Sequence, residues 1–168
     1  MKFGPIATLG AEGAVLAHGL SHGDRKLKKG HRLTASDVAA LSGGGVNHVV
    51  AVQLDADDVP ENEAAALLAE ALAGDGVRTA SAFTGRCNLL ANVAGVLTVK
   101  AGAIHAINAV DEAITVATLP EFEPVDTRTM LATIKIIPYA VKRAALDAAL
   151  SLAKALGPIV EVSPYRPL

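Results

Sequence analysis

The sequence contains no tryptophan, a single cysteine and few aromatic side chains. Three Phe and two Tyr are spread over 168 residues. A surface that stacks nucleic-acid bases needs aromatic side chains. The formal net charge of −2 also gives no overall field that would attract a polyanion. We therefore expect no nucleic-acid partner.

The one cysteine, Cys87, excludes an internal disulfide and fits a reducing compartment. The first residues, MKFGPIATLG, have one lysine and a Gly-Pro break, which is not the pattern of a signal peptide. No apolar run reaches the roughly 18–20 residues that span a bilayer. The sequence thus predicts a cytoplasmic protein with no membrane partner.

Apolar residues are plentiful, at 51%, and most are Ala, Leu, Val and Ile. Their spacing alternates between the periods of strands and helices. We predict an α/β (α+β) protein of two small lobes, each a mixed sheet with one or two helices. The boundary is placed at Gly74-Asp75-Gly76, so the predicted lobes are residues 1–75 and 76–168.

Four segments have helical periodicity or clear helix starts. Thr34 with Asp37, and Asp58 with Glu61, are spaced as capping boxes. The predicted helices are 33–41, 61–73, 101–108 and 143–156, and residues 89–94 are predicted to be helical or a turn. The main predicted strands are 48–54, 77–83, 96–99, 113–119, 130–137 and 158–162.

Charge is concentrated in two short runs. The basic segment HGDRKLKKGHR, residues 22–32, is either a solvated hairpin tip or a site for a phosphate or an acidic partner. The acidic residues between 55 and 63 could bind a hard cation, or they could complement the dipole at the start of the next helix. In both cases we favour the structural interpretation, a solvated hairpin tip for the basic run and charge that complements the helix dipole for the acidic run.

Known catalytic and metal motifs are missing. The sequence has no G-x-S-x-G, C-x-x-C or H-E-x-x-H. Arg86 beside Cys87 could lower the thiol pKa, but no histidine lies nearby in the sequence, so ordinary packing is the alternative. We predict no catalytic residue and no metal site.

The stretch 108–141 holds polar residues next to two strongly β-prone runs. Arg86 and Lys135 could each bind an anion, and period 2 places Lys135 on the same face as Thr133 and Ile137. Arg86 and Asn88 are predicted to follow directly after a strand. The candidate binding residues are Arg86, Asn88, Asn108, Asp111, Glu112, Thr115, Thr118 and Lys135. They form either a ligand site or an internal network in which Arg86 and Lys135 pair with Asp111 or Glu112.

Several segments resemble one protein family. They are MKFGP, GAVLAH, KKGHRLTASDVAAL, DDVPENEAA, FTGRCNLLANVAG, INAVDEAITVATLP and MLATIKIIPYAV. Together they resemble the N-terminal region of bacterial molybdopterin-binding proteins, which are often fused to a molybdenum cofactor cytidylyltransferase-like domain and are related to molybdopterin molybdotransferases. The two most specific motifs are INAVDEAITVATLP and ATIKIIPYAV, because they are long and ungapped.

The resemblance implies a role in molybdenum cofactor biosynthesis. It implies a binding or scaffold module for molybdopterin or its nucleotide form, not catalytic by itself but, within a longer protein, part of a molybdenum cofactor transferase. The chain ends at PYRPL, where such proteins are expected to continue into a further domain. Two other roles stay open: a module that dimerises or docks a molybdoenzyme or a cofactor transferase, and an independent transferase.

Overall fold

The computed structural model describes residues 1–23 and 25–166. Asp24, in the basic segment, and residues 167–168, in the predicted second lobe, lie outside the described residues. The chain divides into two compact units, Met1–Asp58 and Val59–Leu168. The predicted α/β class is confirmed. The predicted boundary after residue 75 is wrong, because the helix that follows Pro60 buries its apolar face in the core of the second unit.

The first unit is a three-stranded antiparallel sheet with one α-helix and a hairpin. The order in the sheet is β1-β5-β2, and the hairpin pairs β3 with β4. The elements are β1 (Lys2–Ala7), the 3-10 helix η1 (Thr8–Gly10), β2 (Val15–Leu16), β3 (Leu20–His22), β4 (Arg25–Leu27), α1 (Ala35–Gly43) and β5 (His48–Gln53). The basic segment therefore includes a hairpin, as one of its two interpretations predicts.

Helix α1 begins where the sequence predicts. The Thr34 side chain accepts a hydrogen bond from the Asp37 backbone, and the Asp37 carboxylate accepts one from the Thr34 backbone, which completes the capping box. His31 Nε2 and Arg25 Nη1 also contact this carboxylate, at 2.8 and 3.3 Å. The hydrogen bond from His31, followed by those from the Thr34 backbone and hydroxyl, holds the pKa of Asp37 well below its usual range. Asp37 thus joins the basic hairpin to the start of α1.

The second unit is built on a four-stranded antiparallel sheet in the order β10-β12-β8-β7. Its strands are β7 (Val77–Thr79), β8 (Arg86–Ala91), β10 (Ile114–Thr118) and β12 (Met130–Ile136). The two β-prone runs of the sequence are therefore neighbours, as β10 and β12. The strand pairs of the two main sheets, β1-β5-β2 and β10-β12-β8-β7, are all antiparallel, where mixed sheets were predicted, and the isolated bridge between Ala73 and Val160 is parallel.

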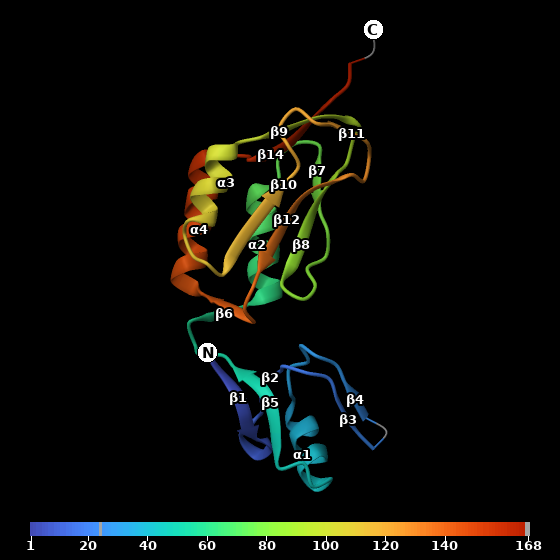
Figure 1. Cartoon of the computed structure of the whole chain (residues 1–168), viewed down its shortest axis with the longest axis vertical. Coiled ribbons are helices and arrows are strands. Elements are labelled where there is room, and N and C mark those ends of the chain that lie inside the picture. The colour runs from blue at the N-terminus through green and yellow to red at the C-terminus, as the bar shows by residue number, and fades with distance from the viewer. Residues whose placement is uncertain (24, 167–168) are drawn as a thin grey trace. The chain divides into compact units, whose positions relative to one another are not determined.

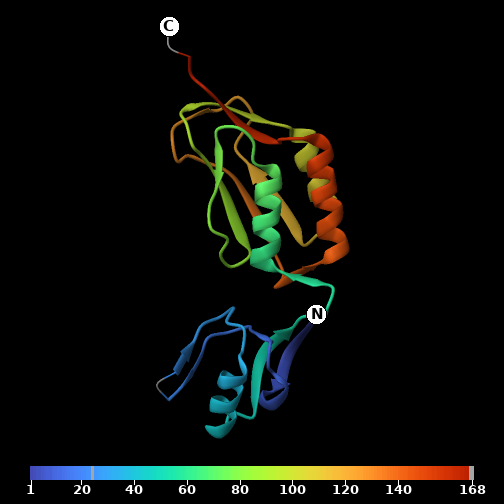
Figure 2. The ribbon, with the colours of Figure 1, turned by 180° about the vertical axis from the view of Figure 1, so that it is seen from behind.

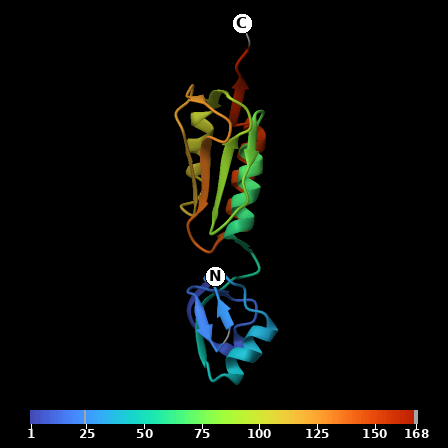
Figure 3. The same cartoon turned by 90° about the vertical axis from the view of Figure 1, so that its right-hand side faces the viewer.

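Three helices pack on this sheet, where one or two were predicted. They are α2 (Glu61–Leu72), α3 (Ala101–Asn108) and α4 (Arg143–Leu156). Figure 1 shows the strands in front of α2, and Figure 2, from behind, shows α2 and α4 in front of the strands. In the view turned by 90°, α2 lies to one side of the strands (Figure 3). One face of the sheet is therefore covered by helices, and the opposite face has no helix on it.

Short strands complete the second unit. The remaining strands are β6 (Asp58–Pro60), β9 (Gly95–Val99), β11 (Pro124–Val125), β13 (Ala140–Lys142) and β14 (Val160–Pro164), arranged as β11-β9-β14 and β13-β6. Within the described part of the chain, no helix is long and apolar enough to cross a membrane.

Two local predictions in the second unit are wrong. Residues 89–94 were expected to be helical or a turn. Residues 92–94 do bend, but Leu89–Ala91 continue strand β8, because alternate side chains of β8 are buried against the helices. Helix α2 has Pro60 as its N-cap and no capping side chain. The Glu61 backbone N–H donates instead to the Tyr139 carbonyl at 3.0 Å, so a distant segment replaces the predicted Asp58–Glu61 capping box.

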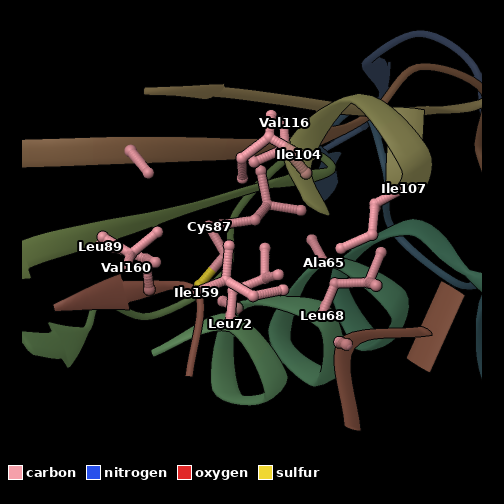
Figure 4. Close-up of a cluster of buried hydrophobic side chains, with 14 of the residues drawn as sticks. Ala65, Leu68, Leu72, Cys87, Leu89, Ile104, Ile107, Val116, Ile159 and Val160 are labelled. Atoms are coloured by element: carbon pink, nitrogen blue, oxygen red, sulfur yellow. The ribbon is translucent and has the colours of Figure 1, made fainter. Parts of the chain in front are cut away.

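Cys87 lies inside the core of the second unit. Figure 4 shows its sulfur among Leu72, Leu89 and Ile159. The thiol donates to the Ala80 carbonyl at 3.1 Å, and burial raises its pKa. A buried thiol with a raised pKa is a poor nucleophile, so Cys87 has the packing role.

Candidate functional site

The face of the four-stranded sheet that carries no helix collects many of the polar residues expected from the sequence. We call it the open face. Side chains on one face of an antiparallel ladder are set by the cross-strand register. The residues that register and alternation place on the open face are Arg78, Phe83, Arg86, Asn88, Leu90, Thr115, Ala117, Met130, Thr133, Lys135 and Ile137.

Arg86 and Lys135 lie directly opposite each other on neighbouring strands. Lys135 on β12 pairs with Arg86 on β8 and with Thr115 on β10. Both cations are exposed, and neither forms an ion pair within the described residues. The internal network with Asp111 or Glu112 is therefore not formed in that part of the chain. The structure instead gives a row of two adjacent, uncompensated cations.

The surrounding strands add no negative charge. The four strands of this sheet contain three basic residues, Arg78, Arg86 and Lys135, and no Asp or Glu. Like charges directly opposite each other on a sheet are destabilising. The open face is thus locally positive, although the net charge of the whole chain is −2.

Hydrogen-bonding groups form the next row of the open face. Thr133 pairs in register with Asn88, and its hydroxyl donates to Asn88 Oδ1 at 3.0 Å. Among the described residues, the amide nitrogen of Asn88 has no hydrogen-bond partner. Residues two apart on a strand are about 7 Å apart, so this donor lies about that far from the row of cations.

A shallow hollow lies farther along the same two strands. Its volume is about 180 Å³, and its lining is more apolar than polar. It is lined by Ala117, Thr118, Leu119, Met130, Leu131, Ala132 and Thr133. The open face therefore offers, in sequence along β12, a cationic row, a hydrogen-bonding row and a hollow.

The other candidate residues lie outside the cationic row and the hydrogen-bonding row. Asn108 ends α3, and its side-chain amide donates to the Val116 carbonyl and accepts from the Val116 N–H, at 2.9 and 2.7 Å. Asp111 accepts from the Ala113 N–H at 2.8 Å in the turn before β10. Glu112 is exposed in the same turn. Thr118 lies opposite Ala132, so alternation turns it away from the two rows, although it lines part of the hollow.

The structure adds residues that sequence reasoning did not select. Phe83 and Arg78 join the open face only because β7 and the turn after it pair with β8. The signal that could have found Phe83 is the Thr84-Gly85 pair, which favours a tight hairpin turn and so places its flanking residues opposite each other. Arg86 and Asn88 lie within β8 and not after a strand.

The acidic run in the first unit has the chain's own amino group beside it. Asp55, Asp57 and Asp58 place carboxylate oxygens within 4.8 Å of one another. The Met1 ammonium contacts Asp55 and Asp58 at 2.5 and 2.9 Å. The hydrogen bonds that the ammonium donates to Asp55 and Asp58 raise the pKa of the Met1 amino group.

Comparison with known proteins reaches the first unit only. A family model described as a domain of unknown function (DUF8806) matches residues 5–53. This range lies within Met1–Asp58 and includes the sheet, α1 and the basic hairpin. No curated protein and no solved structure matches the chain. The open face lies wholly outside the matched range.

Proposed function

We propose that the second unit binds a phosphate-bearing anionic cofactor on its open face. The family resemblance of the sequence names molybdopterin, or its nucleotide form, as that cofactor. The chain then acts as a binding or scaffold module in molybdenum cofactor biosynthesis and is not catalytic by itself. The observation that carries the proposal is the register of Arg86 opposite Lys135 on strands that contain no carboxylate.

The physical argument is electrostatic. Two cations held side by side repel each other, and a bound phosphate removes this repulsion. The guanidinium can hold two phosphate oxygens at once, while the ammonium acts as a point charge that accepts any approach direction. Because these strands carry no carboxylate that could pair with Arg86 or Lys135, both cations can bind an added anion.

The rest of the open face suits the remainder of such a cofactor. The Asn88 amide and the Thr133 hydroxyl can hydrogen-bond to the polar edge of a ring system. The hollow beside Ala117 and Met130 can take a small apolar part of the ligand. It is smaller than the 300–1,000 Å³ usual for a whole small-molecule site, so the ligand lies along the sheet and is not enclosed by it.

Binding of molybdopterin to the purified chain tests the proposal. We expect the double variant Arg86→Ala, Lys135→Ala to bind at least about tenfold more weakly than the wild type, because charge-assisted hydrogen bonds contribute roughly 1.5–3 kcal/mol each. The measurement is titration calorimetry under anaerobic conditions.

A matched control removes the same charges from the helical layer. Arg143 and Lys154 are exposed on α4, so Arg143→Ala with Lys154→Ala changes the net charge equally but leaves the open face intact. This control should bind like the wild type. Equal affinities of the wild type and the open-face variant would overturn the proposal.

A second candidate function rests on exposed apolar side chains of the same face. Ile137 and Met130 are 60% and 52% exposed. Such residues favour a protein contact: a homodimer, or docking to a molybdoenzyme or cofactor transferase. Light scattering over a wide concentration range tests the homodimer. We expect association that Ile137→Glu abolishes, and a monomer at every concentration would exclude self-association.

A further inference from the structure

The turn between β7 and β8 places an aromatic ring in the cationic row. Phe83 and Arg86 exchange two backbone hydrogen bonds, of 2.9 and 3.1 Å, around Thr84 and Gly85. Both turn residues have positive φ, 47° and 70°, as in a two-residue type I′ hairpin. Residues paired in this way present their side chains on the same face of the ladder. The row therefore reads Phe83, Arg86, Lys135, Thr115 across the sheet.

This turn is held from two sides. The Gly85 N–H donates to Asn62 Oδ1 of α2 at 2.8 Å, and the Gly85 carbonyl accepts from the Ile136 N–H at 2.7 Å. A Cβ at residue 85 would lie 2.5 Å from the Ile136 carbonyl oxygen, so the backbones approach as closely as glycine allows. The position of Phe83 is thus fixed by the helix behind the sheet and by the neighbouring strand.

Phe83 is nevertheless 75% exposed. A single exposed apolar residue needs no explanation, but this one is paired in register with Arg86 and lies in one row with both uncompensated cations. Neighbouring strands are about 4.8 Å apart, which places Phe83 roughly 10 Å from Lys135 across the row. A planar ring and a phosphate group linked through a short ester span a similar length.

We propose that this row recognises a planar heteroaromatic ring joined to a diphosphate. The ring stacks on Phe83, and the phosphate oxygens contact Arg86 and Lys135. The inference rests on the proposed function, because it uses the same two cations, and it adds the requirement for a ring. Pterins and nucleoside bases share this chemistry, so the ring can come from either source.

Three probes separate the contributions of the ring and the phosphate. They are inorganic pyrophosphate, adenosine 5′-diphosphate and 6-hydroxymethyl-7,8-dihydropterin diphosphate. We expect the better ring-bearing probe to bind the wild-type chain about tenfold more tightly than pyrophosphate, since stacking on an aromatic side chain gives roughly this gain. Whichever ring-bearing probe binds more tightly identifies the source of the ring.

Variants of Phe83 assign the gain to stacking. Phe83→Ala should lower the affinity for the ring-bearing probe to that for pyrophosphate and leave pyrophosphate binding unchanged. Phe83→Tyr should keep the higher affinity for the ring-bearing probe. Phe122→Ala is the control, because Phe122 is also exposed, at 70%, but lies in the loop after β10. Unchanged urea unfolding of Phe83→Ala would show that the fold is intact.

The outcomes separate this inference from the proposed function. If pyrophosphate binding depends on Arg86 and Lys135 but a ring adds nothing, or if the gain survives Phe83→Ala, the ring inference is wrong and the anion site stands. If neither pyrophosphate nor a ring-bearing probe binds in a way that depends on Arg86 and Lys135, both are wrong.

Discussion

At the scale of single residues, Asn108 shows how a polar side chain can belong to the scaffold. Strand β10 lies at the edge of its sheet, so Val116 has no partner strand on its outer side. The Asn108 amide supplies both the donor and the acceptor that a neighbouring strand would supply. A buried backbone group without a partner is costly. This residue is therefore explained by strand completion and not by ligand binding.

Replacing Asn108 should destabilise the second unit. Asn108→Ala removes both hydrogen bonds and leaves the two polar groups of Val116, a residue that is 3% exposed, without partners. We expect the free energy of unfolding to fall by about 2 kcal/mol, measured by urea denaturation. His105→Ala, on the exposed side of the same helix, should change it little. A loss of the same size in both variants would contradict the argument.

The turn at Thr84 and Gly85 offers two substitutions of opposite effect. Gly85→Ala meets both a positive φ and the Ile136 carbonyl, so unfolding should become easier by at least about 1 kcal/mol. Thr84→Asn should raise the free energy of unfolding by roughly 0.5 kcal/mol, because Asn tolerates the left-handed conformation and Asn-Gly is a preferred type I′ pair. Thermal unfolding of the two variants beside the wild type checks both signs.

The sequence predicted part of the site at this scale. Period 2 correctly placed Lys135, Thr133 and Ile137 on one face, because alternation is a local property. The pairing of Lys135 with Arg86 was not predictable, since register between distant strands depends on how the whole sheet packs. The same holds for Asn108, whose partner Val116 is near in sequence but whose role appears only once β10 is known to be an edge.

At the scale of secondary-structure elements, Asp37 controls the start of α1 and its link to the basic hairpin. Its carboxylate forms hydrogen bonds with Thr34, His31 and Arg25. The capping box was visible in the sequence because it needs only local spacing. The contacts with Arg25 and His31 were not, because they depend on the fold of the hairpin.

The low pKa of Asp37 predicts an acid-sensitive first unit. A carboxyl whose pKa is lower in the folded state stabilises the protein above its unfolded pKa, near 4, and this stability is lost as the pH falls toward the folded value. Above pH 5, Asp37→Asn should lower the free energy of unfolding by about 1 kcal/mol. Below pH 4 the difference from the wild type should shrink.

Urea unfolding between pH 3 and 7, followed by circular dichroism, measures this difference. Asp147→Asn, on the exposed side of α4, is the control and should show no such narrowing. A constant gap between the wild type and Asp37→Asn at all pH values would show that the charge of Asp37 is not the cause.

Most helices and strands were predictable from local sequence patterns, and the wrong predictions share one physical cause. Helices α3 and α4 begin and end at the predicted residues. Residues 89–91 failed because Leu89, Leu90 and Ala91 have good helix propensity, while tertiary packing places them in a central strand. Local helix propensity is overridden where pairing with two neighbouring strands and burial of one face determine the conformation.

At the scale of the whole molecule, the chain has two hydrophobic cores that share no residue. One cluster is confined to the first unit and the other to the second. The boundary was misplaced because Gly74-Asp75-Gly76 is a stronger turn signal than the segment around Asp58. The true division comes before α2, a helix that was assigned to the wrong unit because sequence alone does not say which core a helix covers.

Separate cores predict separate responses to core substitutions. Leu41 is 1% exposed in the first unit, and Leu68 is fully buried in the second. Each substitution by Ala should lower the free energy of unfolding of its own unit by about 2–5 kcal/mol. Hydrogen exchange followed by mass spectrometry should show Leu41→Ala raising exchange in β5 but not in β12, and Leu68→Ala doing the reverse. Loss of protection in both units from either variant would mean that they unfold as one.

The enclosure of Cys87 makes the natural chain a convenient background for chemical labelling. Its thiol is the sole one in the sequence and lies 1% exposed in the core. A cysteine introduced at an exposed position, such as Ala117, would therefore be the one thiol that a maleimide dye reaches in the folded protein. The fluorescence of a dye attached there would report on binding at the open face, and the native cysteine would not have to be removed first.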